Sequence, residues 1–291
     1  MFIGIIPARF ASTRFPGKPL ALIDGKPMIQ RVYEQAKKAL DTVIVATDDE
    51  RIMNCVQRFG GEAVMTSPDH PCGTNRCYEA YCHYILQTQQ HEPPAQRPAE
   101  THTTREQNEM QASRLHSDII INIQGDEPFI DPAQIELIKS CFPADIATLV
   151  TPFRPEDGIA ALLNPNSPKV VIAPICNDSP AYRAILFSRS VIPFMRGVPQ
   201  EKWLEEAQKR GTPFYKHIGM YAYRADILQQ IVALPISPLE QAESLEQLRW
   251  IEAGYQIRVA ITDYQTIGID TPEDLARAEV FLKQRTQDSN S

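Results

Sequence analysis

Three cationic side chains follow a short apolar segment near the N-terminus of this 291-residue chain. Residues 2–6 are rich in isoleucine, which predicts a buried strand. Arg9, Arg14 and Lys18 come directly after that segment. Open α/β sheets bind ligands beyond the carboxyl ends of their strands, and three like charges on one loop would repel one another without an anion among them. The loop therefore predicts a polyphosphate site, with a solvated basic loop as the alternative.

Two common phosphate-binding loops are excluded because residues they require are missing. A P-loop needs Ser or Thr after its lysine to bind magnesium, but Pro19 follows Lys18 here. A dinucleotide-binding fingerprint needs Gly-x-Gly, and no two glycines of the chain have that spacing. The predicted site is therefore a different kind of polyphosphate loop.

Two aspartates could supply the hard oxygen ligands that magnesium prefers. Asp126 follows a predicted strand, residues 119–123, in which four of the five residues are isoleucine, so we expect its carboxylate at the same sheet edge as the cationic loop. Asp270 directly precedes Thr271-Pro272, a typical helix start. Each aspartate has an alternative interpretation as an ordinary turn residue. The spacing alone does not establish that the two meet.

A cluster of potential zinc ligands lies in the first half of the chain. It comprises His70, Cys72, Cys77, Cys82 and His83. No Cys-x-x-Cys pair is present, and the spacing fits no common zinc framework. Helical spacing favours a partly buried helix face instead, with Cys77, Tyr81 and Tyr84 on that face. The six cysteines are scattered through the chain, so a disulfide scaffold is not expected.

Predicted strands and helices alternate through the first half, which indicates an α/β class with a mainly parallel sheet and three layers. After the first strand, the predicted strands are residues 43–47, 63–66 and 119–123, and the predicted helices are residues 27–40, 48–60 and 74–86. The second half predicts strands at 169–173, 184–187, 215–223 and 257–261, and helices near 226–234, 239–253 and 271–283. Residues 88–117 have almost no aliphatic side chains, which predicts a disordered surface insertion.

Charge and composition limit the function classes. The net charge of −7 argues against a general nucleic-acid binder. No apolar stretch approaches membrane-spanning length, so membrane insertion is not expected. The N-terminal apolar run is too short for a signal peptide, and cations follow it instead of preceding it, so we expect a cytoplasmic protein.

Motifs along the whole chain resemble those of the 3-deoxy-manno-octulosonate cytidylyltransferases, the CMP-Kdo synthetases. In chain order they are Ile6-Pro7-Ala8-Arg9, Pro16-Gly17-Lys18-Pro19, Val45-Ala46-Thr47-Asp48, Gly73-Thr74-x-Arg76, Gln124-Gly125-Asp126-Glu127-Pro128, Phe187-Ser188-Arg189, His217-x-Gly219-x-Tyr221, Leu245-Glu246-Gln247-Leu248-Arg249 and Gly268-x-Asp270-Thr271-Pro272-Glu273-Asp274. Each motif is weak alone, but their shared order makes the resemblance specific.

The resemblance implies transfer of CMP from CTP to the anomeric hydroxyl of 3-deoxy-manno-octulosonate (Kdo), with release of pyrophosphate, a magnesium requirement and a role in lipopolysaccharide synthesis. It implies one nucleotidyltransferase domain over residues 1–291, with the fold of the nucleotide-diphospho-sugar transferases. Residues from about 180 to 255 would form a smaller sugar-binding and dimerisation subdomain, so a homodimer is expected.

The resemblance also assigns roles to individual residues. The catalytic residues would be Arg9, Lys18, Asp126 and Asp270, and the two aspartates would hold the metal. The nucleotide would contact Ala8, Arg9, Arg14, Lys18, Gly73 and Arg76. The sugar acid would contact Gln124, Arg189, His217, Tyr221, Glu246 and Gln247.

Two residues depart from the family pattern. Cys72 stands where many relatives have serine, and Asn75 where they have an acid that could pair with Arg76. The same motifs leave other functions open. One is activation of a different ulosonic acid, such as a neuraminic acid, and another is nucleotide binding without catalysis. A sugar-nucleotide-dependent glycosyltransferase commonly carries Asp-x-Asp, which this chain lacks.

Overall fold

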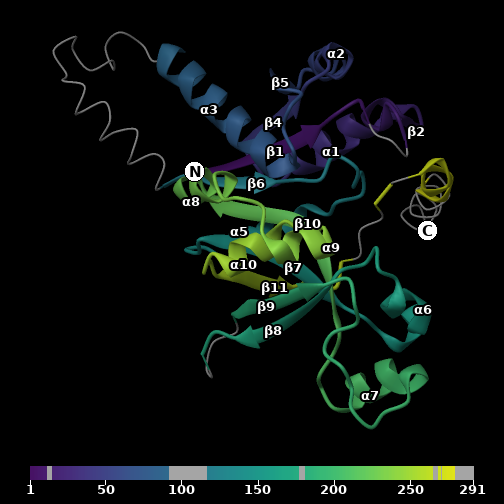
Figure 1. Cartoon of the computed structure of the whole chain (residues 1–291). Helices are drawn as coiled ribbons and strands as arrows, with labels where there is room; N and C mark the ends of the chain where they lie inside the picture. Colours follow the sequence, from purple (N-terminus) through teal and green to yellow (C-terminus); the bar gives the residue numbers. More distant parts are fainter. Residues whose placement is uncertain (12–14, 92–116, 177–180, 265–267, 270, 279–291) are drawn as a thin grey trace. The chain divides into compact units, whose positions relative to one another are not determined.

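The computed structural model describes residues 1–11, 15–91, 117–176, 181–264, 268–269 and 271–278. These residues divide into two compact units. The first unit comprises Met1–Ile135, Arg224–Val232 and the described residues beyond 265. The second comprises Glu136–Tyr223 and the described residues of Ala233–Gln265. Figure 1 shows the elements of both, with α5 (Pro132–Lys139) at the boundary along the chain.

The first unit is built on a parallel sheet. Its strands are β5 (Glu62–Met65), β4 (Thr42–Thr47), β1 (Phe2–Ala8) and β6 (Ile119–Asn122), in that order. The connections contain α1 (Met28–Ala36), α2 (Glu50–Arg58) and α3 (Gly73–His91). β1, β4 and β6 are almost continuously buried, which explains their isoleucine- and valine-rich sequences. The strand–helix alternation predicted for this half is confirmed.

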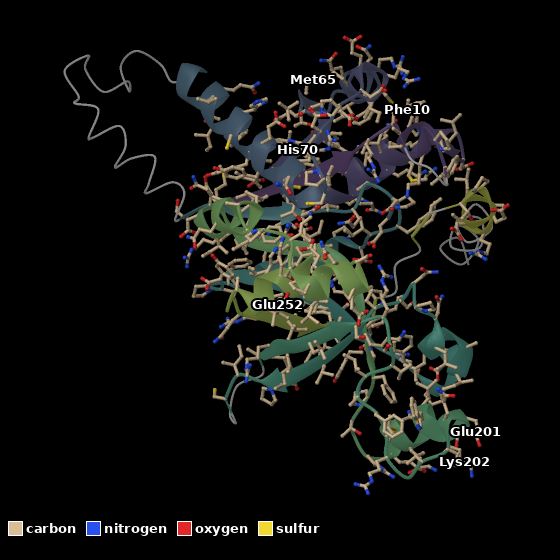
Figure 2. All side chains as sticks on the ribbon, in the orientation of Figure 1. Phe10, Met65, His70, Glu201, Lys202 and Glu252 are labelled. Atoms are coloured by element: carbon tan, nitrogen blue, oxygen red, sulfur yellow. The ribbon has the colours of Figure 1, made fainter. Side chains whose placement is uncertain are left out.

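Strand register aligns the carboxyl ends of this sheet. Ala8 of β1 lies opposite Thr47 of β4, and Thr47 lies opposite Met65 of β5. The next residues along the three strands are Arg9, Asp48 and Thr66. Figure 2 labels Phe10, Met65 and His70, which mark this part of the first unit.

A short hairpin and the C-terminal helix share a small core in the first unit. The hairpin consists of β2 (Leu22–Ile23) and β3 (Lys26–Pro27), after the 3₁₀ turn η1 (Lys18–Leu20). Ile23 and Met28 pack in one buried cluster with Phe129, Ile269 and Ala278. The predicted C-terminal helix start is confirmed: the Thr271 hydroxyl accepts from the Asp274 N–H at 3.2 Å, and residues 272–278 are helical. α8 (Ala225–Val232) packs against α3 in the same unit.

The second unit has a mixed sheet. Its strands are β10 (Tyr215–Arg224), β7 (Ile146–Pro152), β11 (Ile257–Ile261), β9 (Tyr182–Ser188) and β8 (Lys169–Pro174), in that order. β11 and β7 are parallel, and the other neighbours are antiparallel. The sequence predicted four of these strands and missed β7.

Helices of the second unit differ from the prediction in two ways. The predicted helix at 239–253 is in fact two, α9 (Pro238–Glu243) and α10 (Gln247–Glu252), because Ser244 adopts a left-handed conformation with φ of 50°. The sequence also missed α6 (Gly158–Leu163) and α7 (Trp203–Lys209), which follow η2 (Pro155–Asp157) and η3 (Gln200–Lys202). α6 and α7 share a small apolar core in which Trp203 stacks on Phe214; Glu201 and Lys202 beside it are labelled in Figure 2.

The predicted insertion at 88–117 falls mostly on residues 92–116, outside the described residues. The predicted sugar-binding and dimerisation role of residues 180–255 stays a prediction. Among the described helices, none combines the length and apolar character that crossing a bilayer requires.

Candidate active site

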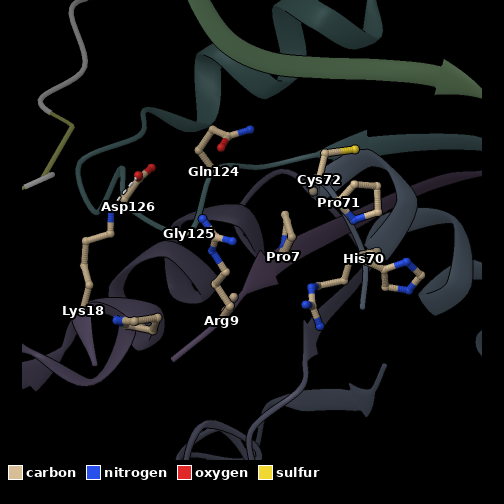
Figure 3. A pocket seen from close by; sticks show the side chains of 13 residues that line it. Pro7, Arg9, Lys18, His70, Pro71, Cys72, Gln124, Gly125 and Asp126 are labelled. Carbon is tan, nitrogen blue, oxygen red and sulfur yellow. Dashed lines mark hydrogen bonds and ion pairs between the residues drawn. The ribbon is translucent and has the colours of Figure 1, made fainter. Parts of the chain in front are cut away.

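A pocket of about 280 Å³ lies where the strands of the first unit's sheet end. All the predicted site residues of the first unit that the structure describes line it: Ala8, Arg9, Lys18, Gly73, Arg76, Gln124 and Asp126. Figure 3 shows Lys18 with Asp126 at one side of the pocket, Arg9 and Pro7 in the middle, and the segment His70–Cys72 at the other side. Arg14 and Asp270 lie outside the described residues.

The loop after β1 is closed by a glycine that no other residue would replace without strain. The Gly17 N–H donates to the Phe10 carbonyl at 2.9 Å, and Gly17 has a φ of 71°. A Cβ at Gly17 would lie only 3.0 Å from the Phe10 ring. The guanidinium of Arg51, on α2, covers that ring at 3.3 Å from its centroid. These contacts fix the turn from which Lys18 extends.

Lys18 and Asp126 form an ion pair inside the pocket. The Lys18 Nζ donates to Asp126 Oδ2 at 2.8 Å, and the side chains are 14% and 32% exposed. The sequence placed these residues on two separate loops at one sheet edge, and the structure confirms that they meet. Partial burial makes the pair stronger than a surface salt bridge.

Close backbone contacts position Asp126. A Cβ at Gly125 would come within 3.0 Å of the Pro7 carbonyl oxygen, so the segment after β6 packs tightly on the end of β1. The Asp126 carbonyl accepts from the N–H of Ile269, which is fully buried, at 2.9 Å. The residue directly before Asp270 is therefore bonded to the backbone of Asp126. Asp270 itself lies outside the described residues, so the meeting of the two aspartates stays a prediction.

The N-terminal turn of α3 forms the opposite wall of the pocket. The Cys72 thiol donates to Asn75 Oδ1 at 2.9 Å, so the two departures from the family pattern interact with each other. Arg76 does not need an acid at position 75, because its Nη2 donates to Asp48 Oδ2 at 2.8 Å and its Nη1 to the Thr66 hydroxyl at 2.5 Å. Sequence reasoning missed Asp48 as a site residue. Its position directly after a buried strand was the available signal.

A second contact from α3 holds the loop after β5, which sequence reasoning also missed. The Glu79 carboxylate accepts from the Ser67 N–H at 2.9 Å and contacts His70 Nε2. Burial would raise the pKa of Glu79, but the hydrogen bonds from His70 and Ser67 hold that pKa below its usual range. His70 lines the pocket, so this loop contributes to its wall.

The zinc alternative finds no support in the part of the chain that the structure describes. No group of three metal-ligating His, Cys, Asp or Glu side chains occurs there. Cys77 and Tyr81 are buried on α3, which confirms the predicted helix face.

In the second unit, two predicted sugar-acid residues lie side by side on β10. The His217 and Tyr221 rings are 5.2 Å apart, across an irregularity in strand pairing between Ile218 and Tyr221. His217 Nε2 lies 3.2 Å from the Thr148 hydroxyl. Burial lowers the pKa of His217 to about 3, so the imidazole is neutral at pH 7. Burial and the nearby Glu246 carboxylate raise the pKa of Tyr221, which remains a neutral hydrogen-bonding group.

Two more predicted sugar-acid residues lie at the start of α10. Glu246 accepts from Arg249 Nη2 at 2.6 Å. Gln247 is 5% exposed, and its Nε2 has no hydrogen-bond partner among the described residues. A buried amide that lacks a protein partner is costly unless a ligand or water satisfies it. Gln247 is therefore a good candidate for ligand binding.

Arg189, the fifth predicted sugar-acid residue of the second unit, belongs to a separate network. Its guanidinium donates to the backbone carbonyls of Pro165, Glu243 and Ser244. The Arg189 carbonyl accepts from the buried Lys169 ammonium at 3.0 Å. Burial and the charge of Arg189 lower the pKa of Lys169, whereas Glu243 opposes this shift. These contacts give Arg189 a structural role, and its predicted contact with the sugar stays a prediction.

The chain is similar to known proteins over nearly its whole length. A family described as cytidylyltransferase matches residues 3–92 and 95–259. A 3-deoxy-manno-octulosonate cytidylyltransferase of Phocaeicola vulgatus is 55% identical over 98% of this chain and 98% of its own length. One from Bacteroides thetaiotaomicron is 51% identical over 98% of this chain and 99% of its own.

A solved structure of CMP:2-keto-3-deoxy-manno-octonic acid synthetase complexed with CTP is 36% identical, with a TM-score of 0.75 over 98% of this chain and 99% of that one. The predicted fold class is confirmed by these matches and by the α/β architecture. The extent and identity of the matches show that this chain belongs to the 3-deoxy-manno-octulosonate cytidylyltransferase family.

Proposed function

We propose that this protein transfers CMP from CTP to the anomeric hydroxyl of Kdo and releases pyrophosphate. The observation that carries the proposal is the pocket at the strand ends of the first unit, where Arg9, Lys18 and Asp126 surround one cavity. Relatives named for this activity, and a synthetase solved with CTP, match nearly the whole chain. The lipopolysaccharide role follows from the product, which would supply that synthesis.

The chemistry requires stabilisation of negative charge. The sugar hydroxyl attacks the α-phosphorus in line and gives up its proton to solvent, a P–O bond forms to the sugar, and the bond to the leaving pyrophosphate breaks. Charge spreads over the phosphoryl oxygens in the transition state. We expect the cationic groups of Arg9 and Lys18 to offset it, together with the predicted contact from Arg14. No covalent intermediate on the protein is needed.

Among the described residues that line the pocket, Asp126 is the acid that could hold a magnesium ion. Asp126 offers a partly exposed carboxylate that already accepts a cationic partner, the Lys18 ammonium, at 2.8 Å. Magnesium is usually held by one or two carboxylates together with substrate phosphates. Asp126 and Asp270 would supply the carboxylates, and the bond from Ile269 to the Asp126 carbonyl supports their pairing. When bound, the ion would neutralise part of the triphosphate charge.

Pyrophosphate release measured with purified protein tests the proposal. We expect release with CTP, Kdo and magnesium together, and none when CTP is replaced by UTP or when Kdo is omitted. Release with a neuraminic acid in place of Kdo would favour the other ulosonic acid activity. Binding of CTP without release under any of these conditions would favour a nucleotide-binding protein. A homodimer and a cytoplasmic location remain predictions, which sedimentation and cell fractionation would test.

A further inference from the structure

A buried ion pair in the pocket wall joins Arg76, a predicted nucleotide contact, to an acid that has no assigned role, Asp48. Arg76, on α3, is 4% exposed and lines the pocket. Its Nη2 lies 2.8 Å from Asp48 Oδ2, and the two side chains are 5% and 15% exposed. Asp48 does not line the pocket, and it follows β4 directly.

A second contact fixes the same guanidinium. Arg76 Nη1 donates to the Thr66 hydroxyl at 2.5 Å, and that hydroxyl donates to the Thr47 carbonyl at 3.1 Å. Thr66 follows β5 directly and is 6% exposed. Arg76 is thus held by the residues that follow two neighbouring parallel strands, and both holding groups are connected to the rigid end of the sheet.

Arg76, like Lys18, has a carboxylate partner, but the partner of Arg76 does not itself line the pocket. The Asp48 carboxylate offsets the Arg76 charge within the wall, so Arg76 adds shape and fixed N–H donors more than net positive charge. A buried guanidinium that loses its carboxylate partner keeps an uncompensated charge. Without Asp48, the Arg76 guanidinium would therefore move toward solvent or toward another anion.

We propose that Asp48 is a positioning residue for nucleotide binding, which acts by holding Arg76 in the pocket wall. This role rests on the proposed function, because it concerns the binding of CTP. Thr66 supports it through the second hydrogen bond. Asp48 itself makes no contact with the nucleotide in this scheme.

The test compares Asp48→Asn with a matched substitution elsewhere in the first unit. Asp226 is 11% exposed and pairs with Arg224 at 2.6 Å, and neither residue lines the pocket. Asp226→Asn therefore weakens an Asp–Arg pair outside the site, whose arginine is 35% exposed against 5% for Arg76. Calorimetric titration with CTP and magnesium should show a dissociation constant raised roughly tenfold to a hundredfold for Asp48→Asn, the effect of one lost charge-assisted hydrogen bond, and roughly unchanged for Asp226→Asn. In turnover, the KM for CTP should rise more than kcat falls.

A double-mutant cycle separates positioning from a general loss of structure. Once Arg76→Ala has removed the guanidinium, adding Asp48→Asn should weaken CTP binding by less than about twofold further. The proposal would be overturned if the two substitutions raised the dissociation constant for CTP independently, by factors that multiply. Wild-type affinity in Asp48→Asn would also overturn it.

If Asp48→Asn fails to fold, Thr66→Val deletes the second contact without removing a charge and should also weaken CTP binding, whereas Thr66→Ser should not. Wild-type affinity in Thr66→Val would count against the role. If the wild-type protein binds no CTP, the proposed function is wrong as well. Each of the other contradicting results argues only against the positioning role of Asp48.

Discussion

The ion pair of Lys18 and Asp126 joins a residue proposed to bind phosphate to a residue proposed to bind metal. The ammonium and the carboxylate lie 2.8 Å apart in the same pocket, so the groups proposed for the phosphates and for the metal are immediate neighbours. Bound nucleotide carries negative charge and a bound metal carries positive charge, and these two groups complement them respectively. The close spacing means that substituting either residue should affect both functions.

Substitution of Lys18 tests its electrostatic role. Lys18→Ala should reduce transition-state stabilisation by about 2–4 kcal/mol, the usual effect of removing one electrostatic donor. The kcat/KM for CTP should therefore fall roughly 30- to 1,000-fold. Steady-state kinetics with saturating Kdo would measure it. Lys26→Ala is the control. Lys26, on β3 of the nearby hairpin, forms an exposed ion pair with Glu34 of α1 and does not line the pocket. Full turnover in Lys18→Ala would contradict the assignment.

His217 makes a prediction about stability and pH. Its pKa in the folded protein is lowered to about 3, whereas the unfolded value is near 6.5. As the pH falls below about 6.5, the unfolded chain binds a proton at this histidine and the folded chain does not. The group therefore reduces the free energy of unfolding by up to ~1.4 kcal/mol per pH unit until the pH approaches 3.

The measurement is urea unfolding of the wild type and of His217→Gln at several pH values from about 7 to about 4. The difference in unfolding free energy between the two proteins should shift in favour of the variant as the pH falls. Parallel pH profiles would show that His217 is protonated as easily in the folded protein as in the unfolded chain. That result would contradict the low pKa of the half-buried His217 imidazole beside Thr148 and Phe187.

At the scale of elements, the parallel half of the fold was predictable because burial on both faces produces unbroken apolar runs. The site was predictable for a related reason, since residues that follow such strands share one sheet edge. β7 was missed because its sequence includes two threonines, Thr148 and Thr151, that are buried in the structure. The buried Thr148 hydroxyl donates a hydrogen bond to the Met220 carbonyl at 2.8 Å. No local sequence pattern reveals this tertiary contact.

The break between α9 and α10 was unpredictable for another reason. The residues around it favour a helix, yet Ser244 takes a positive φ. The Glu243 and Ser244 carbonyls are both used by the Arg189 guanidinium, and the Glu243 carboxylate accepts from the Ser188 hydroxyl and the Arg189 N–H. Contacts with a distant strand end thus override helix propensity. The pairing of Arg76 with Asp48 is also a tertiary contact, since the two residues lie 28 positions apart in the sequence.

At the scale of the whole molecule, the candidate residues divide between the two units. The described nucleotide and metal residues all line a pocket of the first unit, whereas the second unit carries all the predicted sugar-acid residues except Gln124. The division predicts that substitutions in the second unit change the use of Kdo without changing the affinity for CTP. It also identifies Gln247 as the most informative position, because its buried Nε2 has no hydrogen-bond partner within the described part of the chain.

Gln247→Leu removes that amide and retains a side chain of similar size. Removing an unsatisfied buried donor should leave the free energy of unfolding unchanged or slightly higher, since the desolvation cost disappears with the group. The KM for Kdo should rise roughly tenfold or more, because a sugar hydroxyl or carboxylate would lose its partner. The dissociation constant for CTP should stay within about twofold of the wild type. Gln241→Leu, at an exposed position of α9, controls for the change in residue type. A variant that loses stability and retains its KM for Kdo would show that the Gln247 amide serves the fold and not the substrate.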